Sequence, residues 1–232
     1  NDFVRWVEQL PYASLDGIWL YRLEVLGIYI FLLLFLYYLK TRRFRNLVVC
    51  FSCLLCLGIY HTVMRWYDRP CPSLVFYNVR GCPAIHCIAE DGTSWLNYAD
   101  TLSDKRRLQA VAANYWRRHQ LLPPIEVTAD CQNVDFCRHQ QIVFYHGCRI
   151  CMVTDNRWRN KSAASPLFIN YMYLCKGYNG RLEELTGLFS PSCILLDASL
   201  SDDRKQFFRE ECKRLHLHFI TLSEEGSVRF LL

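Results

Sequence analysis

A short turn in the second half of the chain occupies a place where metal chemistry is common. The segment "LCKGYNGRLEEL", residues 174–185, follows an apolar stretch, contains two glycines and then becomes helical in pattern. Ligand sites are often built where a strand ends in a turn and a helix begins. The four positions that matter here are Lys176, Tyr178, Gly180 and Arg181, which supply no imidazole, carboxylate or thiolate.

Fixed positive charge at this turn argues against a metal ion. Zinc is held by thiolate, imidazole or carboxylate groups, none of which these positions provide. Two like charges about 4 Å apart repel by roughly 1 kcal/mol in water, and by more when they are partly buried. We therefore predict no metal at the turn, and a role for Lys176 and Arg181 in holding DNA or an internal carboxylate such as Asp155 or Asp197.

Cysteines and histidines form a second candidate centre. The chain has thirteen cysteines, and a CxxC pair, Cys148 and Cys151, lies near Cys131, Cys137, His139 and His146. The surrounding residues 142–154 predict a hairpin that turns at His146 and Gly147. Strand residues three apart point to opposite faces, so the pair should not converge. We expect buried, reduced thiols, with disulfides or a zinc cluster as the alternatives.

No other catalytic constellation stands out. The remaining acids, imidazoles and hydroxyls are scattered: His61, His86, Asp100, Asp155, Asp197, Ser199, His216 and His218. His216 and His218 are expected on one strand, and no Ser-His-Asp order appears among the rest. The sequence favours a non-enzyme without catalytic residues, metal or cofactor. The alternative is an active metal-dependent nuclease with unrecognised ligands.

Basic residues interleaved with aromatic ones suggest contact with DNA, single- or double-stranded. The formal net charge is +5. The possible contacts are Arg106, Arg107, Trp116, Arg117, Arg118, Arg157, Trp158, Arg159, Lys161, Lys176 and Arg181. Cations beside stacking surfaces suit single strands in particular, although the same pattern also fits a solvated helix face and an ordinary loop.

Two apolar runs in the first third of the chain indicate a membrane anchor, with a buried hairpin of soluble helices as the alternative. Residues 25–39 and 46–64 carry no charge and have aromatic residues at their ends, which is typical of helices that span a membrane. The short linker "KTRRFR" should stay cytoplasmic. This orientation predicts an inner-membrane, multi-pass protein whose soluble part is extracytoplasmic, with membrane lipid as a partner.

The predicted organisation has three parts. These are an interfacial amphipathic segment (1–16), a transmembrane helical hairpin (17–67) and an extracytoplasmic domain (68–232). Because the chain begins at Asn1, we expect it to be a piece of a longer chain or a processed product. Expected strands cover 73–79, the two arms of a hairpin in 84–99, the hairpin 142–154, and 167–175, 192–199, 216–222 and 227–232; expected helices cover 102–119, 183–189 and 201–215. That order predicts an α/β sandwich, two sheets with helices outside.

These residues resemble the metallo-β-lactamase-like domains. "FYNV" followed by "AIHCIAEDGTSWLNYAD" is similar to the opening of such domains, with Asp100 at the acidic end of the hairpin. "KGYNGRLEEL" has the spacing of the family's HxHxDH or HxDxDH metal loop, so Lys176, Tyr178, Gly180 and Arg181 stand at ligand positions. The last 39 residues resemble the end of these domains, with Thr221, Gly226 and Val228 as matches. The resemblance implies a degenerate αββα-like sandwich.

A membrane hairpin that leads into such a domain narrows the resemblance. The arrangement is similar to the C-terminal part of ComEC-type DNA-internalisation (competence) proteins, in a Bacteroidetes-like form. This implies a DNA-uptake channel, with upstream competence helices of the same chain or complex as partners. The soluble domain would be a non-catalytic module that contacts DNA or assists assembly. A further alternative is a membrane-anchored assembly module that binds no nucleic acid.

Overall fold

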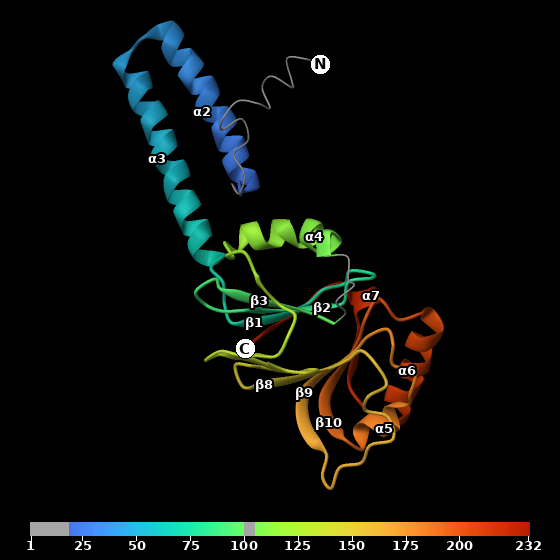
Figure 1. Cartoon of the computed structure of the whole chain (residues 1–232). Helices are drawn as coiled ribbons and strands as arrows, with labels where there is room; N and C mark the ends of the chain where they lie inside the picture. Colours follow the sequence, from blue (N-terminus) through green and yellow to red (C-terminus); the bar gives the residue numbers. More distant parts are fainter. Residues whose placement is uncertain (1–18, 100–104) are drawn as a thin grey trace, which may run out of the picture. The chain divides into compact units, whose positions relative to one another are not determined.

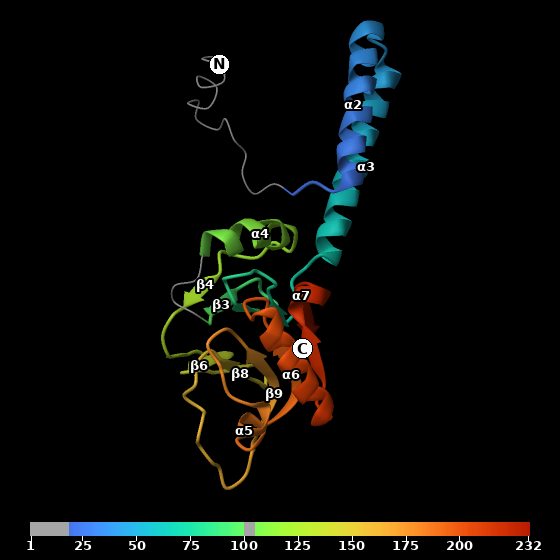
Figure 2. The ribbon, with the colours of Figure 1, turned by 90° about the vertical axis from the view of Figure 1, so that its right-hand side faces the viewer.

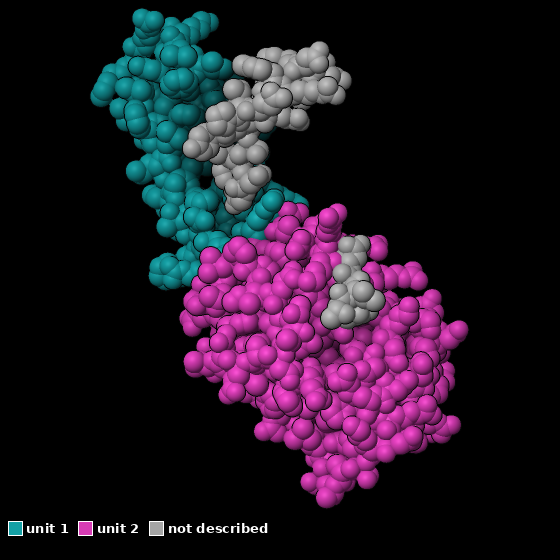
Figure 3. Space-filling view, in the orientation of Figure 1, with its two compact units in different colours: residues 1–69, 117–120 teal, residues 70–116, 121–232 magenta. Residues whose placement is uncertain are grey.

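The computed structural model of the protein describes residues 19–99 and 105–232. The expected interfacial segment 1–16 and the hairpin-end residue Asp100 lie outside the described residues. Contacts divide the chain into two compact units, coloured separately in Figure 3. Unit 1 contains residues 1–69 and 117–120, and unit 2 contains residues 70–116 and 121–232. Each unit is described by itself.

Unit 1 is built on two long helices. Helix α2 (Arg22–Thr41) and helix α3 (Phe44–Tyr67) are joined by a tight turn in which Arg42 adopts a left-handed backbone, with φ 47°. Both helices are long and apolar enough to cross a membrane, and only 6% of each apolar window is buried within the protein. Their apolar side chains therefore face outward, as a pair of lipid-facing helices requires. The expectation of two apolar helices that could form a transmembrane hairpin is confirmed.

Unit 2 contains two β-sheets. The first has the strand order β12-β1-β2-β3-β4, made of β1 (Ser73–Phe76), β2 (Ala84–Ile88), β3 (Ser94–Tyr98), β4 (Ile125–Val127) and β12 (Val228–Leu231). The second has the order β11-β10-β9-β8-β7-β6-β5, made of β5 (Cys131–Gln132), β6 (Phe136–His139), β7 (Ile142–Tyr145), β8 (Cys148–Val153), β9 (Leu167–Leu174), β10 (Phe189–Leu196) and β11 (Phe219–Thr221).

Three apolar cores hold these sheets in layers. The first core lies between the sheets and joins Phe76 and Trp95 of one sheet to Tyr145 and Tyr173 of the other. The second core packs the outer face of the larger sheet against α5 (Leu182–Thr186) and α6 (Asp202–Arg214). The third packs the smaller sheet against α4 (Lys105–Arg118). Figures 1 and 2 show helices outside both sheets, so the predicted mixed α/β sandwich is confirmed.

The two predicted hairpins are confirmed and their turns have a clear cause. β7 and β8 pair antiparallel across His146 and Gly147, whose φ angles are 44° and 76°. Two successive positive φ values define the type I′ turn that matches the twist of a two-residue hairpin. The 84–99 hairpin turns at Gly92, with φ 84°.

Several predicted boundaries are wrong. The helix expected at 183–189 is α5, which ends at Thr186, and Phe189 already belongs to β10. His216 and His218 precede β11, and His216 has φ 53°, so they do not share a strand. Short β5 and β6, and the one-turn helix α7 (Leu222–Glu225), were not predicted. These elements are only two to four residues long, too short to produce a hydrophobic period.

Candidate functional site

The candidate site lies where neighbouring parallel strands end. β8 pairs parallel with β9, and β9 pairs parallel with β10, so their carboxyl ends meet at one edge of the larger sheet. Asp155 lies two residues beyond the end of β8, Lys176 two beyond the end of β9, and Asp197 follows β10 directly. Open sheets of this kind bind ligands beyond the carboxyl ends of their strands.

A cavity of about 440 Å³ opens at this edge. Its lining includes Asp155, Cys175, Lys176 and Ser199, each of which follows one of the three strands. A second hollow shares Lys176, Gly177 and Ser199 with the first, and it adds Arg80 and Arg204. The two therefore form one continuous depression. The volume of the first cavity alone falls within the roughly 300–1,000 Å³ of ordinary ligand sites.

The glycine that opens the turn is required by close packing. Gly177 has φ 116°, and a Cβ at this position would lie 2.2 Å from the carbonyl oxygen of Thr154. The backbone N–H of Lys176 donates to Ser199 Oγ at 3.2 Å, and that of Asn179 donates to Asn156 Oδ1 at 2.8 Å. These contacts hold the turn against the loops that follow β8 and β10.

Tyr178 is a core residue rather than a ligand. Its side chain is buried, its ring stacks on Phe208 of α6, and its hydroxyl donates to the carbonyl oxygen of Arg181 at 2.7 Å. A Cβ on Gly180 would lie 2.3 Å from that hydroxyl oxygen. The Arg204 guanidinium donates to the carbonyl oxygens of Tyr178 and Gly180 at 3.2 and 3.1 Å. Position 180 therefore has no room for an aspartate while Tyr178 keeps this conformation.

Lys176 and Arg181 are exposed at the turn. The two carboxylates proposed as their internal partners are paired elsewhere. Asp155 binds Arg157 through Nη2 at 2.8 Å, and Asp197 accepts the Ser199 N–H at 2.7 Å and the Tyr173 hydroxyl. Among the described residues, neither cation forms an ion pair with either carboxylate. The internal-carboxylate alternative is thus wrong for this conformation.

The two acids at the edge differ in electrostatics. Burial raises the pKa of Asp197, against the opposing effect of hydrogen bonds from Ser199 and Tyr173. For Asp155, burial also favours the neutral acid, but hydrogen bonds and charge from Arg157 outweigh it and hold the pKa below its ordinary value. Asp155 is therefore a paired carboxylate, whereas Asp197 is the more easily protonated of the two.

The CxxC cysteines lie on opposite faces of β8, as predicted. Cys148 packs against the core between the sheets, and Cys151 is buried in the core beneath α6. Burial raises the pKa of Cys151 to about 12, so this thiol is protonated at neutral pH. Within 19–99 and 105–232, no cluster of three or more His, Cys, Asp or Glu side chains could hold a metal ion.

His86 is a core histidine. It is fully buried, its Nδ1 lies 2.8 Å from the Tyr77 hydroxyl, and burial lowers its pKa to about 3. The Trp116 Nε1–H donates to the same Tyr77 hydroxyl at 2.9 Å. The ring is therefore neutral at physiological pH, and it joins α4 to the smaller sheet.

Most of the other candidate DNA contacts already have partners within the protein. Trp158 donates to Gln141 Oε1 at 2.6 Å and packs on Phe189, so it and Trp116 support the fold. Several of the cations have protein partners: Arg107 contacts the Arg80 carbonyl, Arg118 pairs with Asp68, Arg157 with Asp155 and Arg159 with Glu184, and Lys161 lies over the Trp158 ring. Arg106 and Arg117 are exposed on α4.

Arg80 and Arg204 were missed from the sequence. Arg80 lies in the turn between β1 and β2, next to Gly81 with φ 85°, and Arg204 lies in the first turn of α6. A basic residue beside a glycine turn was the available signal for Arg80. Together with Lys176, these side chains give the depression three cationic groups.

Comparison with known proteins identifies a family. The family model described as ComEC C-terminal domain matches residues 74–232, which is more than half of the chain. No curated protein and no solved structure matches the chain.

Proposed function

Because the chain belongs to the ComEC C-terminal domain family, whose proteins act in DNA uptake during competence, we propose that unit 2 is a non-catalytic module that contacts DNA phosphates. One observation carries the proposal: the cavity at the carboxyl ends of β8, β9 and β10 is lined by Lys176, which forms no ion pair within residues 19–99 and 105–232, where a hydrolase would place a metal ligand. An exposed lysine at the mouth of a cavity can bind a phosphate oxygen.

The cationic groups around Lys176 support the same ligand. Arg80 lines the adjoining hollow and is exposed. Arg204 binds two carbonyl oxygens of the turn and so fixes the Lys176 loop instead of reaching outward. Lys176 and Arg80 are therefore the two side chains that reach phosphates, and Arg204 holds the turn that carries Lys176.

The non-catalytic part of the proposal rests on the packing of the turn. Tyr178 fills the core, and its hydroxyl takes the space in which a side chain at position 180 would begin. The resemblance to a metallo-β-lactamase-like domain is then one of backbone layout, with ligand positions reused for packing and for charge. The membrane hairpin would hold this module next to the rest of the uptake apparatus.

Metal content and nuclease activity test the non-catalytic proposal. The full chain, purified in mild detergent, is expected to retain less than one zinc or manganese ion per chain and to leave single- and double-stranded DNA intact with either metal added. Stoichiometric metal together with cleavage that a chelator abolishes would establish the rival, a nuclease with unrecognised ligands.

DNA binding tests the other half of the proposal. The chain is expected to bind short oligonucleotides at low salt and to release them as salt rises, because phosphate contacts displace counterions. An assembly module without nucleic acid would show no binding even at the lowest salt. That result would overturn the proposal and leave the membrane anchor unaffected.

A further inference from the structure

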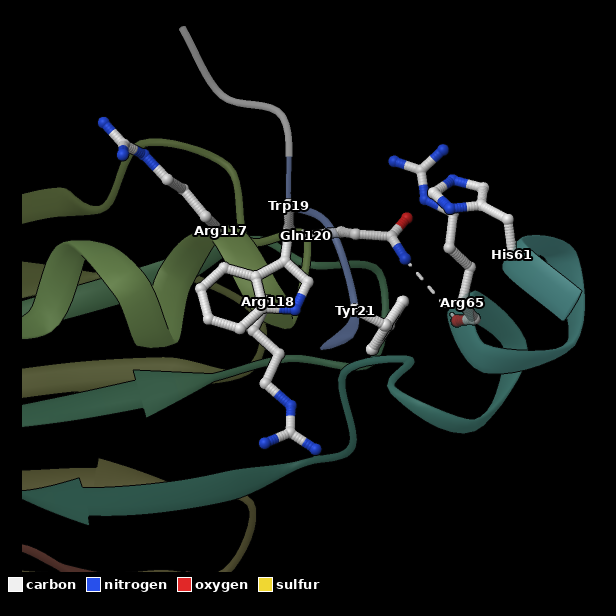
Figure 4. Close-up of a pocket in the computed structure, with 7 residues that line it drawn as sticks. All are labelled: Trp19, Tyr21, His61, Arg65, Arg117, Arg118 and Gln120. Carbon is white, nitrogen blue, oxygen red and sulfur yellow. Dashed lines mark hydrogen bonds between the residues drawn. The ribbon is translucent and has the colours of Figure 1, made fainter. Parts of the chain in front are cut away.

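A polar pocket lies within unit 1, at the ends of α2 and α3 remote from the turn that joins them. Trp19, Tyr21, His61, Arg65, Arg117, Arg118 and Gln120 line it, and all seven belong to unit 1 (Figure 4). The start of α2 and the last turns of α3 are neighbours here, because His61 Nδ1 lies 2.7 Å from the Glu24 carboxylate. In a helix pair long enough to span a bilayer, this end lies at the level of the lipid headgroups.

Several polar groups around the pocket are already paired. Buried Glu24 accepts the Tyr21 N–H at 2.9 Å and binds His61. The Tyr21 hydroxyl donates to Asp68 Oδ2 at 2.7 Å, and the Arg118 guanidinium donates to both oxygens of the same carboxylate at 3.3 Å. This network fixes the helix ends, and it gives both Glu24 and Asp68 partners within the protein.

Two donors at the pocket have no described partner. The Arg65 guanidinium forms no ion pair among the described residues and, in Figure 4, lies beside the His61 ring. His61 and Arg65 are four residues apart in α3 and so share one face of the helix. The Trp19 Nε1–H is buried without an acceptor, which is costly for a buried donor. Arg117 points away from Trp19 in the same view.

We propose that this pocket binds the phosphate of an anionic phospholipid headgroup, with Arg65 and the Trp19 N–H as its donors. A phosphate supplies both an anion for the guanidinium and an acceptor oxygen for the buried indole. The pocket holds about 200 Å³, below the roughly 300–1,000 Å³ of ordinary ligand sites, so it suits one headgroup rather than a stacked nucleotide. Trp19 and Tyr21 are residue types that concentrate at the membrane interface.

The inference rests on the proposed membrane anchoring but can fail separately from it. Resistance of the chain to carbonate extraction from membranes reports anchoring alone. A preference for an anionic over a neutral lipid headgroup reports binding in the pocket. A chain that is anchored and has no headgroup preference overturns this inference and leaves the anchoring intact. Extraction of the chain from membranes by carbonate would overturn both the anchoring and the headgroup site.

Native mass spectrometry of the full chain, released from detergent with equal amounts of phosphatidylglycerol and phosphatidylcholine, measures the preference. The wild-type chain is expected to retain one phosphatidylglycerol preferentially. Arg65→Gln should reduce that preference by about tenfold, the effect expected when a charge-assisted hydrogen bond is lost. Trp19→Phe keeps the aromatic bulk and should also reduce it.

The matched control is Arg45→Gln, which removes one charge from the opposite end of α3. Its preference should equal that of the wild type, and equal losses in Arg65→Gln and Arg45→Gln would overturn the site. Helix content by circular dichroism excludes unfolding as the cause of a loss.

A competition experiment distinguishes the lipid from other anions. Displacement of the lipid by millimolar inorganic phosphate would assign a free-anion site, and displacement by a single-stranded oligonucleotide would assign a nucleic-acid site. Either result would overturn the lipid proposal.

Discussion

At the scale of single residues, the turn after β9 is a packed structural element that carries charge. Tyr178, Gly180 and Arg204 fit one another so closely that a longer side chain at position 180 would clash with the Tyr178 hydroxyl. Gly180→Ala places a Cβ against the Tyr178 hydroxyl, and the overpacking should cost about 1–3 kcal/mol of unfolding free energy. Thermal unfolding of the full chain in nonionic detergent measures it.

The control for this prediction is Gly187, a glycine at which an added Cβ would make only ordinary van der Waals contacts. A Cβ on Gly187 would meet its nearest atoms at 3.6 and 3.7 Å, so Gly187→Ala should change stability by no more than about 0.5 kcal/mol. Equal effects at both glycines would contradict the packing account of the turn.

Placing metal-ligand side chains at the turn should not create a metal centre. The triple variant Lys176→His, Gly180→Asp, Arg181→His meets the same clash at position 180, and a metal centre also needs supporting contacts that orient its ligands. We expect no tight zinc binding and no DNA cleavage. Zinc retention at one ion per chain together with cleavage would show that the remainder of a hydrolytic centre is intact.

The raised pKa of Asp197 leads us to predict a specific pH dependence of the unfolding free energy. Its folded pKa is raised above the ordinary 3.8, so the folded chain binds the extra proton and this contribution to stability is lost as pH rises through the folded pKa. Asp197→Asn cannot titrate, so its stability relative to the wild type should improve from about pH 4 upward.

Asp155→Asn provides a control of opposite sign. The Asp155 pKa is lowered, so its contribution is present above pH 3.8 and is lost as pH falls through the folded pKa. This variant should be relatively weaker at neutral than at acid pH. Melting curves at several pH values compare the two variants. Parallel curves would contradict the electrostatic assignments at the strand ends.

At the scale of elements, the β7–β8 hairpin shows where local sequence decides structure. A Cβ on Gly147 would meet nothing within 4 Å, and its φ is 76°. Gly147→Ala should therefore cost about 1–2 kcal/mol through backbone strain alone. His146→Asn, at φ 44°, should be neutral, because asparagine tolerates left-handed backbone. Thermal unfolding separates the two; a neutral Gly147→Ala would contradict the turn assignment.

The sequence predicted the elements with strong local signals. Apolar helices 25–39 and 46–64, the turn at His146–Gly147 and the opposed faces of Cys148 and Cys151 follow from periodicity and turn chemistry. The start of β10 at Phe189 was missed, although Gly187, the C-cap of α5, was an available signal that the helix stops there. Arg80 lies in the turn between the paired strands β1 and β2. It lines the hollow together with residues that follow β9 and β10, and local sequence does not show that these segments meet.

At the scale of the whole molecule, the charges at the turn of the hairpin predict which compartment unit 2 occupies. Four basic residues, Lys40, Arg42, Arg43 and Arg45, lie at the helix turn, and the positive-inside rule keeps such turns cytoplasmic. The C-terminus should then be extracytoplasmic. A C-terminal reporter active only outside the cytoplasm should be active, with a cytoplasm-only reporter as the control. The reverse pattern would contradict the proposed orientation.

Salt dependence of DNA affinity tests the central claim, that Lys176 contacts DNA phosphate from a non-catalytic module. Affinity for a single-stranded oligonucleotide is measured in a salt series for the wild-type chain, Lys176→Ala and Lys213→Ala; Lys213 is exposed at the end of α6 and does not line the depression. We predict that Lys176→Ala makes the negative slope of log K against log salt shallower by about 0.7, while Lys213→Ala leaves the slope unchanged. Identical slopes for all three chains would contradict the claim.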